Sequence, residues 1–291
     1  MKYYLQNAKR YLIYMFHLIK GGYPKLKLLK QLDKLNAEEK ELFSSYVVGQ
    51  VGSGKLTTEG YSLTQLDFGI FKANNNKWGG YKLKKGEKYI QHIFKSGSKI
   101  GWYYLTPNKN RGVIGYPEIF IGKSPFGGDT TNEYFPKKIE DIKTLEATYD
   151  VSMYIEPKKY NLAFDLWVTK KGKNKTSDIS HEIMIWEDRN VAMPAGKFKG
   201  EVHTTSGIYR MYHTWMDRTS ENLGTPGWYF TAFVRKEGTR TNVVDLNEFI
   251  YHMLLEGILN ENHFISTIEF GNEIYNACGY TIVNNYNLNI K

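Results

Sequence analysis

The sequence contains very little cysteine, since Cys278 is the only one among 291 residues. A single thiol cannot form an intrachain disulfide, so the fold must depend on noncovalent packing. This scarcity leaves the cellular compartment open, because many secreted prokaryotic proteins also lack disulfides. Cys278 lies in a strand-like run without an evident base partner, and we predict that it is a buried structural thiol.

The sequence also lacks a hydrophobic run long enough for a membrane span near its N-terminus. The uncharged run there covers residues 11–19, whereas a spanning helix needs about 20 residues. The run has the length of a signal-peptide core, but no small-x-small cleavage site follows it. We expect residues 1–46 to form an amphipathic helical extension that packs on the domain or contacts a membrane surface, with a cleaved signal as the alternative.

Several common catalytic motifs are absent. Residues 49–55 (GQVGSGK) resemble a phosphate-binding loop, but Leu56 stands where Ser or Thr would hold Mg²⁺. His181 and Glu182 do not begin a zinc-binding HExxH motif, because Ile185 occupies the place of the second histidine. The sequence has no GxSxG motif, and its histidines show no metal-ligand spacing. We therefore predict neither a cofactor nor a bound metal.

Positive charge is concentrated at the N-terminus. The net charge is +9, and residues 1–50 carry 9 Lys and Arg against 4 Asp and Glu. The remainder of the chain is only mildly basic, so nucleic-acid binding is not predicted.

Aromatic residues and glycine are abundant, which favours an all-β protein with many turns. Aromatics make up 15% of the chain, including 23 Tyr, and 27 residues are Gly. Short strand patterns separated by turn signals run from about residue 61 to residue 244, which indicates a sandwich or barrel. One helix is predicted over residues 245–260, with Asp245 as N-cap and Glu248 completing a capping-box-like pair. We predict one β domain over residues 47–291, and a monomer.

Residues 181–186 (HEIMIW) carry the first candidate site. Read as a strand, they place Glu182, Met184 and Trp186 on one face and two isoleucines on the other. A carboxylate on a strand face costs free energy unless it is solvated or paired. Beside Met and Trp, the floor of a sugar-binding cleft satisfies this condition, because aromatic rings stack on the C–H faces of sugars. The alternative is a half-buried Glu beside a structural Trp.

Two further strand patterns add carboxylates. Residues 161–168 place Asp165 and Trp167 opposite an apolar face, and Asp165 lies near Glu182 if the two strands are neighbours. Residues 268–275 place Glu269, Glu273 and Tyr275 on one face. Two carboxylates across a sugar-binding groove are what glycosidic hydrolysis needs. A solvated, exposed Asp remains the alternative for Asp165.

Five motifs in one order resemble glycoside hydrolase family 12. They are residues 75–79 (NNKWG), 116–119 (YPEI), 164–167 (FDLW), 182–186 (EIMIW) followed by 194–196 (PAG), and 271–275 (GNEIY). The resemblance covers residues 47–288, and the predicted helix precedes the last motif, as in that family.

The resemblance implies a β-jelly-roll of two curved antiparallel sheets whose concave face hydrolyses a β-1,4-glucan internally and with retention. It implies Glu182 as nucleophile, Glu273 as acid/base and Asp165 as partner of the nucleophile. It also implies a substrate-binding surface formed by Asn76, Trp78, Met184, Trp186, Pro194 and Tyr275.

The sequence departs from the family pattern at three residues. Glu187 stands where the family usually has an apolar residue, and Asn272 and Ile274 replace Thr and Pro around the acid/base. These departures leave the preferred glucan open, with cellulose, mixed-linkage β-glucan and xyloglucan as candidates. A non-catalytic glycan-binding jelly roll remains the alternative function. We expect an extracellular or cell-surface location.

Overall fold

The computed structural model describes residues 65–82, 90–96, 98–106, 112–127, 131, 134–156, 159–173, 175–221, 223–275 and 277–291. The expected helical extension over residues 1–46 and the expected domain start at residue 47 lie outside these ranges. Within these ranges, no helix has both the length and the apolar character that crossing a membrane requires.

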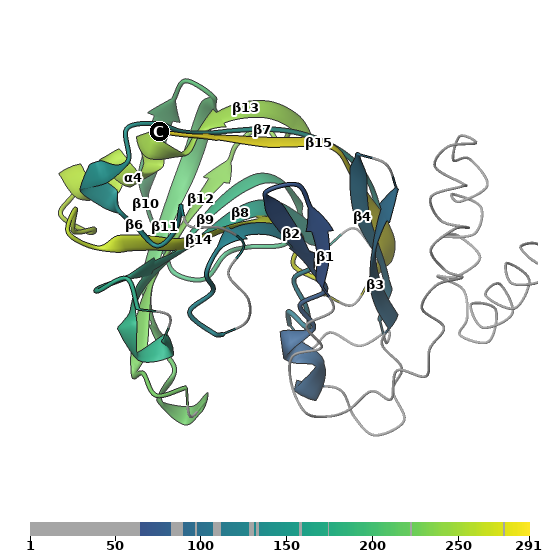
Figure 1. Cartoon of the computed structure of the whole chain (residues 1–291), viewed down its shortest axis with the longest axis horizontal. Coiled ribbons are helices and arrows are strands. Elements are labelled where there is room, and N and C mark those ends of the chain that lie inside the picture. The colour runs from purple at the N-terminus through teal and green to yellow at the C-terminus, as the bar shows by residue number, and fades with distance from the viewer. Residues whose placement is uncertain are drawn as a thin grey trace, which may run out of the picture.

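The described chain forms two β-sheets, which confirms the predicted all-β sandwich. In spatial order the larger sheet contains β1 (Gln65–Phe68), β2 (Phe71–Asn74), β5 (Glu118–Gly122), β14 (Phe264–Gly271), β8 (Tyr160–Thr169), β9 (Ile179–Asn190), β12 (Gly227–Arg235), β11 (Gly207–Asp217) and β10 (Lys197–Thr204), and the short β6 (Lys137–Lys138) pairs with β14. The smaller sheet contains β13 (Thr241–Asp245), β7 (Leu145–Glu156), β15 (Cys278–Ile290), β4 (Lys99–Leu105) and β3 (Ile90–Ser96). Figure 1 shows β7, β13 and β15 above β8, β9, β12 and β14.

Strand pairing is antiparallel throughout, except between β9 and β12, which run parallel. In the described part of the chain, short 3₁₀ helices lie between strands: η1 (Trp78–Lys82), η2 (Ile139–Asp141), η3 (Thr176–Asp178) and η4 (Thr219–Glu221). Trp78 begins η1 and is separated from the end of β2 by residues 75–77.

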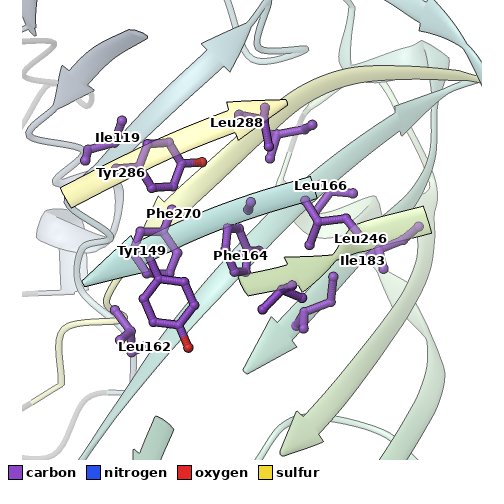
Figure 2. Close-up of a cluster of buried hydrophobic side chains, with 14 of the residues drawn as sticks. Ile119, Tyr149, Leu162, Phe164, Leu166, Ile183, Leu246, Phe270, Tyr286 and Leu288 are labelled. Carbon is purple, nitrogen blue, oxygen red and sulfur yellow. The ribbon is translucent and has the colours of Figure 1, made fainter. Parts of the chain in front are cut away.

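The hydrophobic core lies between the two sheets. Figure 2 shows Phe164 and Phe270 of the larger sheet against Tyr149 and Tyr286 of the smaller one. The ring centroids of Phe164 and Phe270 are 4.6 Å apart, and those of Phe270 and Tyr149 are 5.0 Å apart. The core face of β8 and β9 is the one predicted from the alternation of their residues, so the opposite face is left for the cleft. Cys278 is buried in β15, as predicted.

Glu187 is a buried charge within this core. It is 0% exposed, and its carboxylate accepts hydrogen bonds from the hydroxyls of Tyr149 at 2.7 Å and Tyr209 at 2.6 Å, and from the Asn242 amide at 3.1 Å. Arg235 Nη1 lies 3.4 Å from it. A buried carboxylate is tolerated when donors surround it, so these four partners explain how an acidic residue replaces an apolar one here.

The predicted helix exists but is shorter than expected. Helix α4 covers Leu246–Leu255, and the Asp245 carboxylate caps it by accepting a hydrogen bond from the backbone N–H of Asn247 at 2.9 Å. The helix ends before residue 260 because Gly257 adopts a positive φ of 66°, which stops helical geometry. The expected capping box is not formed: the Glu248 carboxylate instead accepts hydrogen bonds from the backbone and hydroxyl of Thr205.

Candidate active site

A cleft of about 590 Å³ lies on the face of the larger sheet that points away from the core. Carboxyl and apolar side chains of β5, β14, β8 and β9 form its floor, among them Glu118, Glu269, Asp165, Glu182 and Met184. The walls come from η1, the turn after β5, and the segment between β11 and β12. These walls contribute Trp78, Phe126, Arg218, Glu221 and Leu223.

Strand register places the floor carboxyls side by side. Asp165 on β8 pairs with Glu269 on β14 and with Met184 on β9. Glu182 pairs with Trp167, two residues along β8 from Asp165. Directly paired residues point to the same face of a sheet, so β14, β8 and β9 each present a carboxyl to the cleft. The predicted proximity of the Asp165 and Glu182 strands is thus observed.

Glu182 is half-buried in the floor and has one strong donor. The indole Nε1 of Trp228 donates a hydrogen bond to its Oε2 at 2.6 Å. Burial raises the pKa of Glu182 to about 7, while the Trp228 hydrogen bond and the charge of Arg218 act against this rise. The Glu273 carboxylate adds to the rise in the pKa of Glu182, which places both groups in one electrostatic environment.

Glu273 lies two residues after the end of β14 and is held by two side chains. The Asn161 amide donates to its Oε2 at 2.5 Å, and the Tyr275 hydroxyl donates to the same oxygen at 2.9 Å. The backbone N–H of Glu273 donates to Asn161 Oδ1 at 2.8 Å, so Asn161 fixes both ends of the residue. Burial raises the pKa of Glu273 to about 6, against the lowering by these donors and by Lys82 and Lys159.

Burial is the main cause of the raised pKa in both glutamates, and the charge of Glu182 is not among the causes that act on Glu273. Because two interacting carboxyls titrate as a pair, the pair holds one proton between about pH 6 and 7.

Asp165 lies on the strand next to that of Glu182 and is almost closed off from solvent. It is 6% exposed, and its Oδ1 has no hydrogen-bond partner among the described residues. Burial and the negative charges of Glu182 and Glu269 raise its pKa well above the usual range for Asp. The same causes favour the neutral form of Asp165, in which it is able to donate a hydrogen bond to a neighbouring carboxylate.

Glu118 is a further cleft carboxyl that the sequence analysis did not single out. It is 2% exposed and accepts hydrogen bonds from the Asn74 amide at 2.9 Å and the Asn76 amide at 3.0 Å. Asn76, the predicted sugar-binding residue, lines the cleft with its amide directed at Glu118. Burial and the charge of Glu269 raise the pKa of Glu118 well above its usual range.

Three of the six residues expected to bind substrate line the cleft, and three do not. Asn76, Trp78 and Met184 line it, and Lys82 Nζ lies 4.4 Å from the centroid of the Trp78 ring. The others are outside its lining: Trp186 is only 2% exposed and donates its Nε1–H to Met184 Sδ, Tyr275 is buried and donates to Glu273, and Pro194 is half-buried after β9.

Trp228, Asn161 and Arg218 are site residues that the sequence analysis missed. Trp228 lies in the largely apolar strand β12 and shows no sequence signal that distinguishes it from a structural Trp. Asn161 is a buried amide at the start of β8, and a polar residue beginning an otherwise apolar strand was the available signal. Within the described ranges, no group of three or more His, Cys, Asp or Glu side chains is arranged to hold a metal ion.

Comparison with known proteins gives one consistent result. The family model described as glycosyl hydrolase family 12 matches residues 70–291. The sequence is 26% identical over 219 residues to endoglucanase S of Pectobacterium parmentieri, covering 75% of this chain and 80% of that protein.

Solved structures show the same fold. The family 12 xyloglucanase from Bacillus licheniformis superposes with a TM-score of 0.70 at 24% identity, covering 79% of this chain and 97% of that one. Trichoderma harzianum endoglucanase 3 superposes with a TM-score of 0.65 at 17% identity, covering 78% and 94%.

Proposed function

Because the chain belongs to glycosyl hydrolase family 12 and is a glycoside hydrolase resembling endoglucanases, we propose that it cleaves β-1,4-glucan chains internally, with retention of anomeric configuration. The observation that carries this proposal is the pair Glu182 and Glu273, which line one cleft and are held by separate donors. A binding protein needs aromatic side chains but no such pair, so a non-catalytic role is not retained.

The shape and lining of the cleft support a polymeric substrate. Apolar and aromatic side chains from both walls, Trp78 and Phe126 among them, offer surfaces on which sugar rings stack. Relatives with this fold include proteins described as endoglucanases and as a xyloglucanase. We propose an unbranched or xylosyl-branched β-1,4-glucan as substrate, with Trp78 as a stacking surface.

In the first step, ionised Glu182 attacks the anomeric carbon and forms a glycosyl ester. The bond to the departing chain breaks as Glu273 donates its proton to the glycosidic oxygen. Trp228 holds Glu182 in position and favours its ionised form by donating a hydrogen bond to it. The neighbouring Asp165, whose raised pKa favours its neutral form, is proposed to do the same as a second donor.

In the second step, a water molecule releases the sugar. Glu273, now ionised, accepts a proton from that water while the water oxygen attacks the anomeric carbon and displaces Glu182. Two inversions give net retention. Asn161 and Tyr275 hold the Glu273 carboxyl in one orientation through both steps. The pair holds one proton between about pH 6 and 7, so activity is expected to peak in that range. The reaction uses the arrangement with this proton on Glu273, although the higher pKa belongs to Glu182.

Replacing each glutamate tests the assignment. Glu182→Ala and Glu273→Ala should each remove most hydrolysis of carboxymethylcellulose, β-glucan and xyloglucan while the fold is kept. Azide should rescue Glu182→Ala with an inverted glycosyl azide, and Glu273→Ala with a retained one when the leaving group is good. Glu140→Ala, at an exposed carboxylate outside the cleft, is the control and should remain active.

Two product measurements decide the remaining parts of the proposal. NMR during the first turnovers should show the β-anomer from a β-glucan, and viscosity should fall faster than reducing ends appear if cleavage is internal. Appearance of the α-anomer first would contradict retention, and release of only glucose would contradict internal cleavage.

We also propose that the enzyme acts as a monomer outside the cell or at its surface, where polymeric glucans are accessible. Residues 1–46 are proposed to be dispensable for catalysis and to contact membrane surfaces through their basic residues. A protein beginning near residue 46 should retain hydrolysis but lose binding to anionic vesicles.

A further inference from the structure

Glu269 is a buried carboxyl in the cleft for which the two-step mechanism has no use. It is 6% exposed and stands on β14, directly paired with Asp165 on β8. Side chains of paired positions have Cβ atoms about 4.5–5.5 Å apart and point to the same face, so the two carboxyls lie side by side on the cleft face, close enough for the charge of Glu269 to act on Asp165. Asp165 in turn neighbours Glu182, and the three carboxyls form a row across β14, β8 and β9.

The three carboxyls of this row do not have the same number of hydrogen-bond donors. Glu182 receives a hydrogen bond from Trp228 and is influenced by the positive charge of Arg218. Glu269 receives a long hydrogen bond from the Thr267 hydroxyl at 3.3 Å and another from the Trp167 side chain. Oδ1 of Asp165 is buried and has no partner among the described residues, although buried polar atoms almost always have one.

The other groups facing the row are mostly acidic. Glu118 approaches from β5, Glu273 from the end of β14, and the buried Tyr116 from the segment before β5. Of the positive groups, Arg218 lines the cleft wall and Lys82 lies in η1 with its Nζ over the Trp78 ring. In this environment several adjacent charges are costly, so the negative charge belongs on the member with the most solvent and the best donors, which is Glu182.

We infer that Glu269 is a neutral carboxylic acid that donates its proton to Oδ1 of Asp165 and thereby orients the proton that Asp165 donates to Glu182. In this arrangement Glu269 and Asp165 are both protonated, Glu269 donates to Asp165, and Asp165 donates to Glu182. The single negative charge of the row then lies on Glu182, at the oxygen that attacks the sugar. Each bond polarises the next, so the Glu269 donor strengthens the hydrogen bond to Glu182. Glu269 is a positioning residue, and this role rests on the proposed function, in which Glu182 is the nucleophile.

The protonation state agrees with this geometry. Burial raises the pKa of Glu269 to about 8, and the negative charge of Glu182 adds to the rise. Glu269 is therefore neutral at the pH where Glu182 must be ionised.

An infrared measurement tests the neutral state without reference to hydrolysis. The difference spectrum between the wild-type protein and Glu269→Gln at pH 6.5 should show the carbonyl band of one protonated carboxyl group in the wild type. Loss of a carboxylate band instead would show that Glu269 is ionised and would overturn the inference. Failure of the enzyme to hydrolyse any glucan would count against the proposed function and leave this measurement valid.

A pH profile tests the positioning role. In a Glu273→Gln background, an aryl β-cellobioside with a good leaving group needs no acid, so the pH dependence of its first step reports the ionisation of Glu182 alone. Glu269→Met, which has similar length but no donor, should raise the pKa of Glu182 by about half a unit, corresponding to a weakened hydrogen bond. Glu269→Gln retains an N–H donor and should leave the pKa close to the wild-type value.

The alternatives give different results in the same experiment. If Glu269 acted as a negative charge, both variants would lower the pKa of Glu182, because a neighbouring charge is removed. If Glu269 only filled space, neither variant would move it. Either result would overturn the inference. Should Glu269→Met fail to fold, the infrared result and the pH profile of Glu269→Gln still decide between a neutral and an ionised Glu269.

Discussion

At the scale of single residues, the ionisation of Glu182 depends on one indole. Trp228 donates its Nε1–H to Glu182 at 2.6 Å, and its ring packs between neighbours, with centroids 5.2 Å from Trp167 and 6.0 Å from Phe126. The residue therefore has two separable roles, in hydrogen bonding and in packing. A phenylalanine at this position keeps most of the aromatic packing but cannot donate the hydrogen bond.

Trp228→Phe should shift the pH–activity profile upward. An N–H donated to a carboxylate stabilises its ionised form, so loss of this donor raises the pKa of Glu182 and reduces activity on the acid side. The expected shift of the acid limb of kcat/KM is up to about one pH unit. Trp215→Phe is the control, because Trp215 is 45% exposed and belongs to the opposite face of β11, as its pairing with Tyr229 indicates. An unchanged or lowered acid limb in Trp228→Phe would contradict the role.

At the scale of elements, α4 depends on a cap that belongs to the preceding strand. Asp245 ends β13 and caps α4, and Phe249 of that helix packs against Tyr209 and Phe233 at centroid distances of 4.8 and 5.0 Å. The helix thus closes one end of the core and stands apart from the cleft lining. Its stability and the catalytic geometry should therefore be separable.

Asp245→Ala should destabilise the protein by about 1 kcal/mol, the usual cost of losing an N-cap side chain. Chemical denaturation measures this change as a lower midpoint at constant slope. Asn247→Ala is the matched control, because Asn247 supplies only its backbone N–H to the cap and alanine provides the same group. Equal destabilisation by both substitutions would show that the cap is not the cause. Hydrolysis of β-glucan should be unchanged in both.

At the scale of the whole molecule, the row of buried carboxyls makes stability depend on pH. In the folded state the pKa of Glu269 is about 8 and that of Glu182 is about 7, compared with an ordinary value of 4.5. Between pH 6.5 and 8 the folded protein holds more protons than the unfolded chain, so the free energy of unfolding falls as pH rises. Histidines whose pKa is lowered by burial, such as His181, are neutral in the folded protein but still bind protons in the unfolded chain near pH 6.5, so they oppose this decline at the lower end of the range and no longer affect it towards pH 8.

The melting temperature should therefore fall from pH 6.5 to pH 8, and Glu269→Gln should make this decline shallower because glutamine does not titrate. Calorimetry at several pH values in this window measures both slopes. A melting temperature that rises across the window, or an identical slope in the variant, would show that Glu269 does not hold an extra proton in the folded state.

The sequence by itself determined the fold class, the core face of each long strand and the position of the capped helix. Side chains on a strand alternate with a period of two, so residues 162–168 and 182–186 reveal their core and cleft faces without any knowledge of their neighbours. The cap of α4 was equally readable, because it involves residues next to each other in the chain. The end of α4 and the contact of Glu248 with Thr205 were not readable from the sequence, because both depend on the fold around them.

Only the tertiary structure decided which carboxyls share the cleft and how each is protonated. Glu182 and Glu273 are separated by many strands in sequence, and the order β14-β8-β9 brings them to one surface. The same order places Glu269 beside Asp165 and Trp228 beside Glu182, and it buries Trp186 away from the cleft. A pKa depends on solvent, charges and donors within a few ångströms, and strand pairing between distant segments determines all three.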